Sequence, residues 1–212
     1  MSDSGIGLRE IKKQLTRESI ADAALQLALE KGLDNVTIEE IANLAFVSPR
    51  TFSNYFSCKE EAVATAGTQA NFEVIEQLAH RPAEEPPLQS IAHVIIAAAR
   101  ERTDEQVALS ARKLRLSREH PSLQPFQTAQ YDALEAAMRH VVAERTGTDA
   151  ETDLYPGLVT SVAVAATKHA ITTWVFSQTP REHLPELLAE AFEQLGSGLP
   201  APQPGVGPSP GE

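Results

Sequence analysis

Residues 37–56 read TIEEIANLAFVSPRTFSNYF, and this stretch carries the signals for two short helices separated by a tight turn. Thr37, followed by Glu40 three positions later, forms the capping-box pattern that opens a helix. Ser48 is a favourable N-cap residue and Pro49 suits the first helical position, so a second helix begins there. A short, well-capped helix with polar residues on its free face has the size and chemistry that fit a DNA major groove.

The second of these helices divides into an apolar face and a polar face. Phe52 and Phe56 lie four residues apart and point inward together. The polar face carries residue types that match groove chemistry, since arginine pairs with guanine, asparagine pairs with adenine and a threonine methyl packs on thymine. Lys59 opposes the dipole of the next helix, so a nearby phosphate explains it better than helix stability does. The candidate DNA-binding residues are Thr37, Ser48, Pro49, Arg50, Thr51, Ser53, Asn54, Tyr55 and Lys59.

The rest of the chain is also predicted to be helical. Glycine is sparse between residues 8 and 195, and no alternating stretch is long enough to require a sheet. The helix after the motif is expected to start at Ser57 as N-cap, with Glu60 completing a second capping box, and to continue to about residue 78. The other predicted helices span residues 16–31, 88–102, 106–118, 125–145, 153–177 and 181–195.

Composition shifts predict four segments. Residues 1–13 form a flexible arm, whose Arg9, Lys12 and Lys13 either touch DNA or are simply solvated. Residues 14–74 form a helix-turn-helix domain with its motif at 37–56, and residues 75–195 form a second helical domain. The proline-rich sequence of residues 81–87 breaks the chain between them. Residues 196–212 contain five glycines and five prolines and are predicted to be disordered.

The charge balance limits how this chain can bind DNA. Its formal net charge is −11, and residues 1–67 alone hold seven Lys and Arg against ten Asp and Glu. A general nucleic-acid binder is therefore excluded, and a local basic cluster must act against an unfavourable overall field, with strong salt dependence. One cysteine, no signal-peptide pattern and no apolar run of bilayer length together predict a cytoplasmic protein that has no membrane partner.

Taken together, residues 14–74 resemble the N-terminal DNA-binding domain of the tetracycline-repressor (TetR) family of bacterial regulators. The resemblance rests on Ile20, Ala23-Ala24, Lys31-Gly32, Thr37-Ile38, Ile41-Ala42, Val47-Ser48, Thr51-Phe52, Tyr55-Phe56 and Lys59-Glu60. It implies an all-α fold, in which a three-helix helix-turn-helix domain precedes a helical ligand-binding and dimerisation domain. It further implies a repressor that forms a homodimer through its last two long helices. The homodimer would bind an inverted-repeat operator. A small-molecule effector would move the fourth helix and release the DNA.

Two positions depart from the family pattern. Many members have glycine where Phe46 stands in the turn, and a bulky residue is costly there if the backbone needs a positive φ. Either the turn differs, or the Phe46 ring fills a gap in the local core. Many members also carry an aromatic residue at the position of Ser53, so one apolar or phosphate contact is expected to be missing here.

The effector-binding residues are harder to identify, because no spacing rule fixes a pocket. Arg112, Lys113, Arg115 and Arg118 share one predicted helix and either receive an anionic ligand or form a solvated face. Aromatic side chains at helical spacing either line a pocket or belong to the core. His169 and Trp174 lie on a helix rich in alanine, which suits close packing in a dimer. The candidate effector residues are Phe72, Arg112, Arg115, Phe126, Tyr131, His169 and Trp174.

The sequence contains no pattern typical of a catalytic centre. The histidines lack ligand spacing, and neither a glycine-rich phosphate loop nor a nucleophile elbow is present, so we expect no metal, no cofactor and no enzymatic activity. Two alternatives to the regulator stay open at this stage. One is a helical enzyme that uses its N-terminal helices for docking, and the other is an interaction module whose third helix meets an acidic protein instead of DNA.

Overall fold

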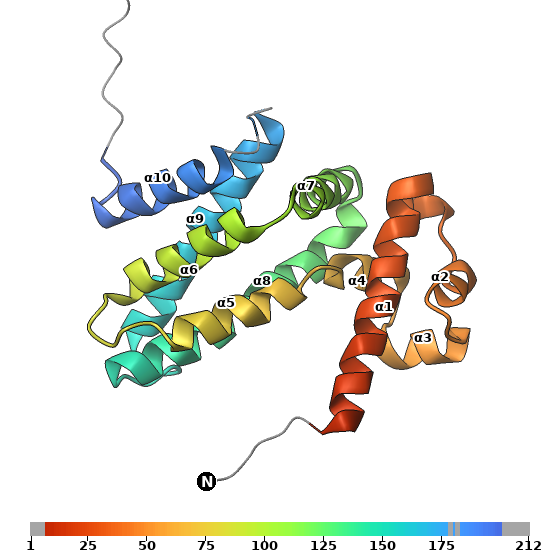
Figure 1. Cartoon of the computed structure of the whole chain (residues 1–212), viewed down its shortest axis with the longest axis horizontal. Helices are drawn as coiled ribbons and strands as arrows, with labels where there is room; N and C mark the ends of the chain where they lie inside the picture. Colours follow the sequence, from red (N-terminus) through yellow and green to blue (C-terminus); the bar gives the residue numbers. More distant parts are fainter. Residues whose placement is uncertain (1–6, 178–179, 181–182, 201–212) are drawn as a thin grey trace, which may run out of the picture.

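The computed structural model describes residues 7–177, 180 and 183–200, and these residues form ten α-helices and no strand (Figure 1). The predicted all-α class is therefore confirmed. The helices are α1 (Leu8–Lys31), α2 (Ile38–Leu44), α3 (Pro49–Tyr55), α4 (Lys59–Thr65), α5 (Gln69–Ala79), α6 (Pro87–Glu101), α7 (Asp104–Glu119), α8 (Gln124–Thr146), α9 (Leu154–Phe176) and α10 (Leu184–Gly196), with single 3₁₀ turns η1 (Leu33–Asn35) and η2 (Pro121–Leu123).

Helix α1 is longer than the sequence pattern predicted. It begins at Leu8 rather than near Thr16, so the part of the proposed arm from Leu8 onward is helical, while residues 1–6 lie outside the described residues. The added segment contains mostly good helix formers, and Glu10 lies in the first turn, where a negative charge is favourable. The predicted end of the helix is confirmed at Gly32, whose N–H donates to the Ala28 carbonyl at 3.1 Å.

The helix predicted after the motif is divided into two. Helix α4 ends at Thr65, Gly67 has a φ of +75°, and α5 begins at Gln69. Glycine takes this backbone conformation without strain, and the Thr68 hydroxyl donates to the Thr65 carbonyl at 2.9 Å across the break. The predicted Ser57 cap is also wrong by one position.

Cys58 is the N-cap of α4, and its sulfur accepts from the Glu61 N–H. The N–H and hydroxyl of Ser57 both donate to the Glu61 carboxylate at 2.7 Å. The reciprocal interaction therefore uses Glu61 rather than Glu60. The five later helices lie within a few residues of their predicted bounds, and the predicted tail is described only as far as Pro200.

The helices pack around three apolar clusters. One fills the space between α1, α2, α3 and α4, and it also buries Leu116 of α7 and Leu123 of η2. The second joins α5, α6, α8, α9 and α10, and the third joins α6, α7, α9 and α10. Figure 1 shows the first group of helices at one end of the molecule and the remaining helices as a layered bundle beside it. Because Leu116 and Leu123 cross between the groups, the two predicted domains share part of one core.

Candidate nucleic-acid interface and effector cavity

The N-terminus of α2 is built by the predicted capping box. The Thr37 hydroxyl accepts from the Glu40 N–H at 3.3 Å, and the Glu40 carboxylate accepts from the Thr37 N–H at 2.9 Å. Lys31 from the end of α1 pairs with Glu40 at 2.5 Å. The bond from Lys31, followed by the bonds from Thr37, lowers the pKa of Glu40 to about 2. Thr37 itself is exposed, so the start of α2 is accessible from solvent.

Helix α3 is fixed at its start and along its inner face. The Ser48 hydroxyl accepts from the Thr51 N–H at 3.0 Å, and Pro49 occupies the first helical position, as predicted. The Phe52 ring is fully buried, and it contacts the ring of Phe56 with a centroid separation of 5.8 Å. The apolar face predicted from the sequence is therefore confirmed.

The outer face of α3 presents two polar side chains that no other described residue engages. Arg50 and Asn54 are exposed, and neither side chain hydrogen-bonds to another described residue. Ser53 is exposed but donates to the Pro49 carbonyl at 3.2 Å. Tyr55 is half-buried against the first apolar cluster. Arg50 and Asn54 are thus the two groups on this face whose hydrogen-bonding capacity is still available to a ligand.

Lys59 lies in the first turn of α4, as predicted, but its ammonium is bonded within the protein. Its ammonium donates to the carbonyls of Leu33 at 2.8 Å, Val36 at 2.9 Å and Asp34 at 3.4 Å, all in or next to η1. An ammonium has three N–H donors, and these carbonyls occupy them. Lys59 thus ties the start of α4 to the segment between α1 and α2, and these bonds compete with the predicted phosphate contact.

The turn before α3 contains a strained residue. Phe46 has a φ of +56°, in the left-handed region that bulky residues rarely adopt, and 96 % of its surface is exposed. The ring therefore fills no gap in the core. The turn keeps the backbone conformation that glycine favours, and Phe46 adopts it at an energetic cost.

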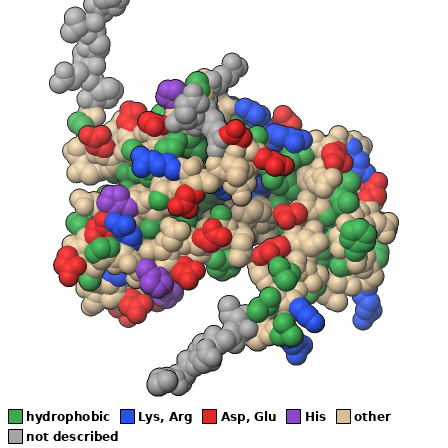
Figure 2. All heavy atoms as spheres, in the orientation of Figure 1, with side chains coloured by type: hydrophobic (Ala, Val, Ile, Leu, Met, Phe, Trp, Pro, Cys, Tyr) green, Lys and Arg blue, Asp and Glu red, His purple; other side chains and the backbone are tan. Residues whose placement is uncertain are grey.

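Basic side chains gather near this surface. Arg9, Lys12 and Lys13 are exposed along the first two turns of α1, and Arg50 is exposed on α3. Figure 2 shows Lys and Arg side chains projecting from the lower edge of the N-terminal end, and acidic side chains on the rest of that end and across the bundle. Lys13 pairs with Glu10 at 3.3 Å, while exposed basic groups of this kind are what a DNA ligand requires of a chain with a net charge of −11.

A second candidate site lies inside the bundle, where two cavities adjoin. One, of about 200 Å³, lies between α4, α7 and α8, and the other, of about 140 Å³, lies between α5, α6, α8 and α9. Asn71, Arg102 and Tyr131 line both, so the two adjoin and make up one region of the bundle. Its outer end is polar, with Ser110, Lys113, Gln127 and Gln130, and its inner end is apolar, with Val74, Ile95, Met138, Val164 and Leu188. We call this space the central cavity.

The charged groups of the central cavity are basic. Burial lowers the pKa of Arg102, and burial lowers the pKa of Lys113 to about 8, partly offset by the charge of Asp22. Burial also raises the pKa of Tyr131. Removing basic groups from water costs free energy, which an acidic ligand group recovers by pairing with them.

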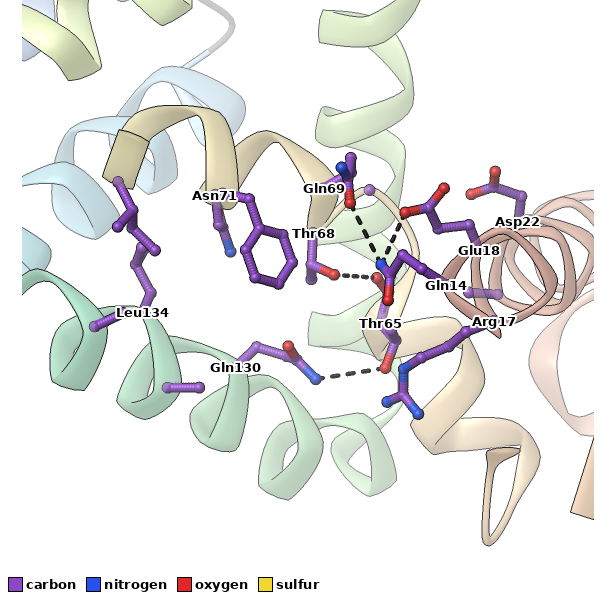
Figure 3. A pocket seen from close by; sticks show the side chains of 16 residues that line it. Gln14, Arg17, Glu18, Asp22, Thr65, Thr68, Gln69, Asn71, Gln130 and Leu134 are labelled. Carbon is purple, nitrogen blue, oxygen red and sulfur yellow. Dashed lines mark hydrogen bonds between the residues drawn. The ribbon is translucent and has the colours of Figure 1, made fainter. Parts of the chain in front are cut away.

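A third cavity, of about 280 Å³, opens between α1, α5 and α8. Figure 3 shows Gln14 of α1 reaching across to Gln69 of α5, and Gln130 of α8 donating to Thr65 at the end of α4. These contacts join the N-terminal helices to the bundle beside the break between α4 and α5.

The residues predicted to bind an effector fall in several different places. Tyr131 lines the central cavity, Phe72 lines the cavity of Figure 3, and His169 lies in a groove between α9 and α10. The other four do not line these spaces. The guanidinium groups of Arg112 and Arg115 donate to the carbonyls of Leu29 and Val175, respectively. The Trp174 ring is buried in the third cluster, and Phe126 is half-buried on α8.

Sequence reasoning did not single out Arg102 and Lys113, the basic residues of the central cavity. Lys113 belongs to the predicted basic run, but spacing alone does not tell which member of the run faces inward. Within the described residues, no group of three His, Cys, Asp or Glu side chains is arranged to hold a metal, and no helix is both long and apolar enough to cross a bilayer.

Sequence comparisons identify relatives of both halves of the chain. Residues 20–64 match the family described as "Bacterial regulatory proteins, tetR family", and residues 85–200, more than half of the chain, match the "MftR C-terminal domain". The HTH-type transcriptional regulator TcmR of Streptomyces glaucescens is 29 % identical over 198 residues, which cover 91 % of this chain and 88 % of that protein.

Solved structures with the same fold include two repressors. FadR of Thermus thermophilus, a TetR-family repressor solved with lauroyl-CoA, is 26 % identical with a TM-score of 0.54 and covers 89 % of this chain and 99 % of its own. SmeT, the repressor of the Stenotrophomonas maltophilia efflux pump SmeDEF, has a TM-score of 0.56 at 19 % identity, over 89 % of this chain and 97 % of its own. This chain belongs to the TetR family and is a DNA-binding transcriptional regulator, not an enzyme.

Proposed function

We propose that this regulator is a cytoplasmic homodimeric repressor, which binds an inverted-repeat operator through α3 of each protomer and leaves it when a small molecule occupies the central cavity. The observation that carries the DNA-binding part is the exposed face of α3, where Arg50 and Asn54 have no partner in the described protein. Because the capped helix already orders the backbone that carries both side chains, binding costs little further conformational entropy there.

The DNA-facing residues divide into two roles. Arg50 and Asn54 are the proposed base readers, because both side chains are exposed and able to bind a base edge through two hydrogen bonds. The starts of α2 and α3, at Thr37 and Ser48, are proposed phosphate contacts, and so is the Tyr55 hydroxyl. The Thr51 methyl is a proposed contact to a base, and Pro49 and Ser53 flank these groups. Lys59 is withdrawn from this set because its ammonium is already bonded.

The dimer interface is proposed on α9 and α10. Leu158 is 53 % exposed, and Val162, Ala165 and His169 follow it at helical spacing on the same face. This face borders a groove shared with Leu187 and Ala191 of α10. A two-fold dimer pairs the same patch on both protomers, and small residues let the helices approach closely.

The effector is proposed to bind in the helical domain of residues 75–195, together with Asn71 and Val74 at the end of the preceding segment. TcmR is an HTH-type transcriptional regulator and FadR is a TetR-family repressor. FadR was solved with lauroyl-CoA, a molecule with an apolar tail and an anionic head. The central cavity of this chain likewise has an apolar end and a basic end.

The experiment that tests this function is selection of random double-stranded DNA on the purified protein, followed by binding of the enriched sequence across a salt series. We expect an inverted repeat and a steep salt slope. Arg50→Ala and Asn54→Ala should each cost about 1–3 kcal/mol on the operator and relax the preference at one base of each half-site, with little loss on random DNA. Failure to enrich any sequence at low salt would contradict the proposal.

Glu73→Ala serves as a matched control, because this residue is exposed on α5, away from α3. It should leave the selected sequence and the salt slope unchanged. Equal loss of operator and random DNA in Asn54→Ala would contradict its role as a base reader.

A further inference from the structure

The break between α4 and α5 is the place where the N-terminal helices join the bundle. Thr65 ends α4, Ala66 is extended with a ψ of 134°, and Gly67 has a φ of +75°. A Cβ atom added to Gly67 would meet no atom within 4 Å, so this part of the chain has open space around it. The carbonyls at the end of a helix have lost their helical partners and need donors from elsewhere.

Lys113 of α7 provides those donors. Its ammonium donates to the Ala64 carbonyl at 2.7 Å and to the Ala66 carbonyl at 2.5 Å. Among the described residues no acidic side chain forms an ion pair with Lys113. A charged group thus reaches from a distant helix and hydrogen-bonds to neutral oxygens, while the Asp22 carboxylate acts on it through its charge and not through an ion-pair contact. Ammonium groups bind anions more strongly than neutral oxygens.

The same three residues border the central cavity. Ala64, Ala66 and Lys113 all line its polar end, together with Ser110 and Gln130. An anion that enters this end therefore meets an ammonium whose present partners are backbone carbonyls. The apolar end of the cavity, between α5, α6 and α9, has space for a hydrocarbon or aromatic body.

We propose that the effector is an amphiphilic anion, and that its acidic group draws the Lys113 ammonium away from the carbonyls of Ala64 and Ala66, which frees the break between α4 and α5. This inference rests on the proposed function, because it specifies how occupation of the central cavity reaches the DNA-binding helices. No large movement of the bundle is required, since the ammonium only exchanges one set of acceptors for another.

The chemistry of the exchange favours the liganded state. A carboxylate or phosphate accepts a charge-assisted bond, which is roughly twice as strong as a bond between neutral groups. The released carbonyls lie at the edge of an open cavity, where water can hydrate them. Gln130 still donates to the Thr65 hydroxyl at 3.4 Å, so α4 keeps one weaker tie to α8.

The first test measures binding without any DNA. Octanoate, decanoate and dodecanoate are compared by calorimetry with the alcohols of the same chain length, and decyl phosphate separates phosphate from carboxylate recognition. We expect the best anion to bind roughly ten- to a hundredfold more tightly than its alcohol, because a charged hydrogen bond replaces a neutral one. Equal affinity of every anion and its matched alcohol would overturn the proposal.

Variants identify the residue responsible. Lys113→Met should remove the preference for anions, Lys113→Arg should keep it, and Arg112→Met, on the outer side of the same helix, should leave it unchanged. Circular dichroism checks that each variant folds. If Lys113→Met does not fold, Lys113→Arg still tests whether a charged group is needed at this position. Loss of the preference in Arg112→Met but not in Lys113→Met would contradict the assignment.

Hydrogen exchange then reports on the break itself. The amides of residues 66–71 should exchange faster when the best anion is bound, and operator affinity should fall by roughly 5- to 150-fold. Tight anion binding with unchanged exchange would overturn the release mechanism. If binding and exchange behave as expected but no operator sequence can be selected, the proposed repressor function fails while the role of Lys113 stands.

Discussion

At the scale of single residues, Phe46 has a positive φ, which bulky residues normally avoid, and its side chain gains no packing in return. Its φ is +56° and its ring is 96 % exposed, so strain is present and burial is not. We expect Phe46→Gly to raise the free energy of unfolding by roughly 0.5–1 kcal/mol, because relief of left-handed strain outweighs the added entropy of glycine in the unfolded chain.

Urea denaturation followed by circular dichroism measures this change. Asn43→Gly, in the exposed part of α2, is the matched control and should be neutral or slightly destabilising, since no strain is relieved there. If Phe46→Gly were the more destabilising of the two, the strain argument would be wrong. A fall in operator affinity in a more stable Phe46→Gly protein would show that the exposed ring touches DNA.

Lys59 offers a second test at the same scale, because its two explanations predict different defects. Lys59→Met should lower the free energy of unfolding by about 1–3 kcal/mol, since the carbonyls of Leu33 and Val36 lose their donor. The salt slope of DNA binding should not change, because no phosphate contact is removed. A flatter salt slope with unchanged stability would restore the role predicted from the sequence.

At the scale of helices, a helix boundary could be predicted from the sequence only where residues within about one turn determine it. The starts of α2 and α3 were predicted correctly, because Thr37, Ser48 and Pro49 act on residues within one turn. The break between α4 and α5 was missed, because both sides read as helix and the donor that satisfies the freed carbonyls comes from Lys113, far along the chain. For the same reason Arg102 was missed as a cavity residue, and Lys113 was predicted only as one of four basic residues that could receive an anionic ligand.

One arginine holds the connection between α5 and α6. Arg145 of α8 donates to the carbonyls of Leu78, Arg81, Pro82 and Glu85 and to the Ser90 hydroxyl, at 2.8–3.1 Å. Arg145→Met should therefore lower the free energy of unfolding by about 3 kcal/mol, as several polar groups lose their partner together. Arg139→Met on the same helix removes only a 3.4 Å contact with Glu151 and should cost less than about 1 kcal/mol.

Thermal unfolding of the two variants side by side measures the difference. Equal stability would mean that water replaces the Arg145 guanidinium at no cost.

The connection between α5 and α6 also predicts that the stability of the protein depends on pH. Arg81, then Ser90 and His93, lower the pKa of Glu85 from 4.5 to about 2. A carboxyl whose pKa is lowered on folding stabilises the protein fully above pH 4.5, and this contribution is lost as the pH falls toward 2. Glu85→Gln should therefore reduce the loss of stability between these pH values, which acid titration of the folded fraction would show. An identical acid transition in wild type and variant would contradict this.

At the scale of the whole molecule, a single chain leaves the apolar outer face of α9 uncovered. Leu154, Leu158 and Ala165 are exposed on a helix that is apolar on nearly every side, and such helices are normally buried. A second copy of the chain would cover this face, and the symmetric pairing would set the distance between the two α3 helices. Affinity for an inverted repeat then depends on this contact as much as on α3 itself.

Leu158→Asp tests that dependence. A charge placed in the centre of a dimer interface loses water without gaining a partner, so the variant should sediment as a monomer at concentrations where the wild type is a dimer. It should remain helical, and it should bind the full operator no better than a single half-site. Phe72→Asp, an equally exposed apolar position on α5, should stay dimeric. A dimeric Leu158→Asp protein with full operator affinity would move the interface elsewhere, and the spacing of the reading helices would then need another origin.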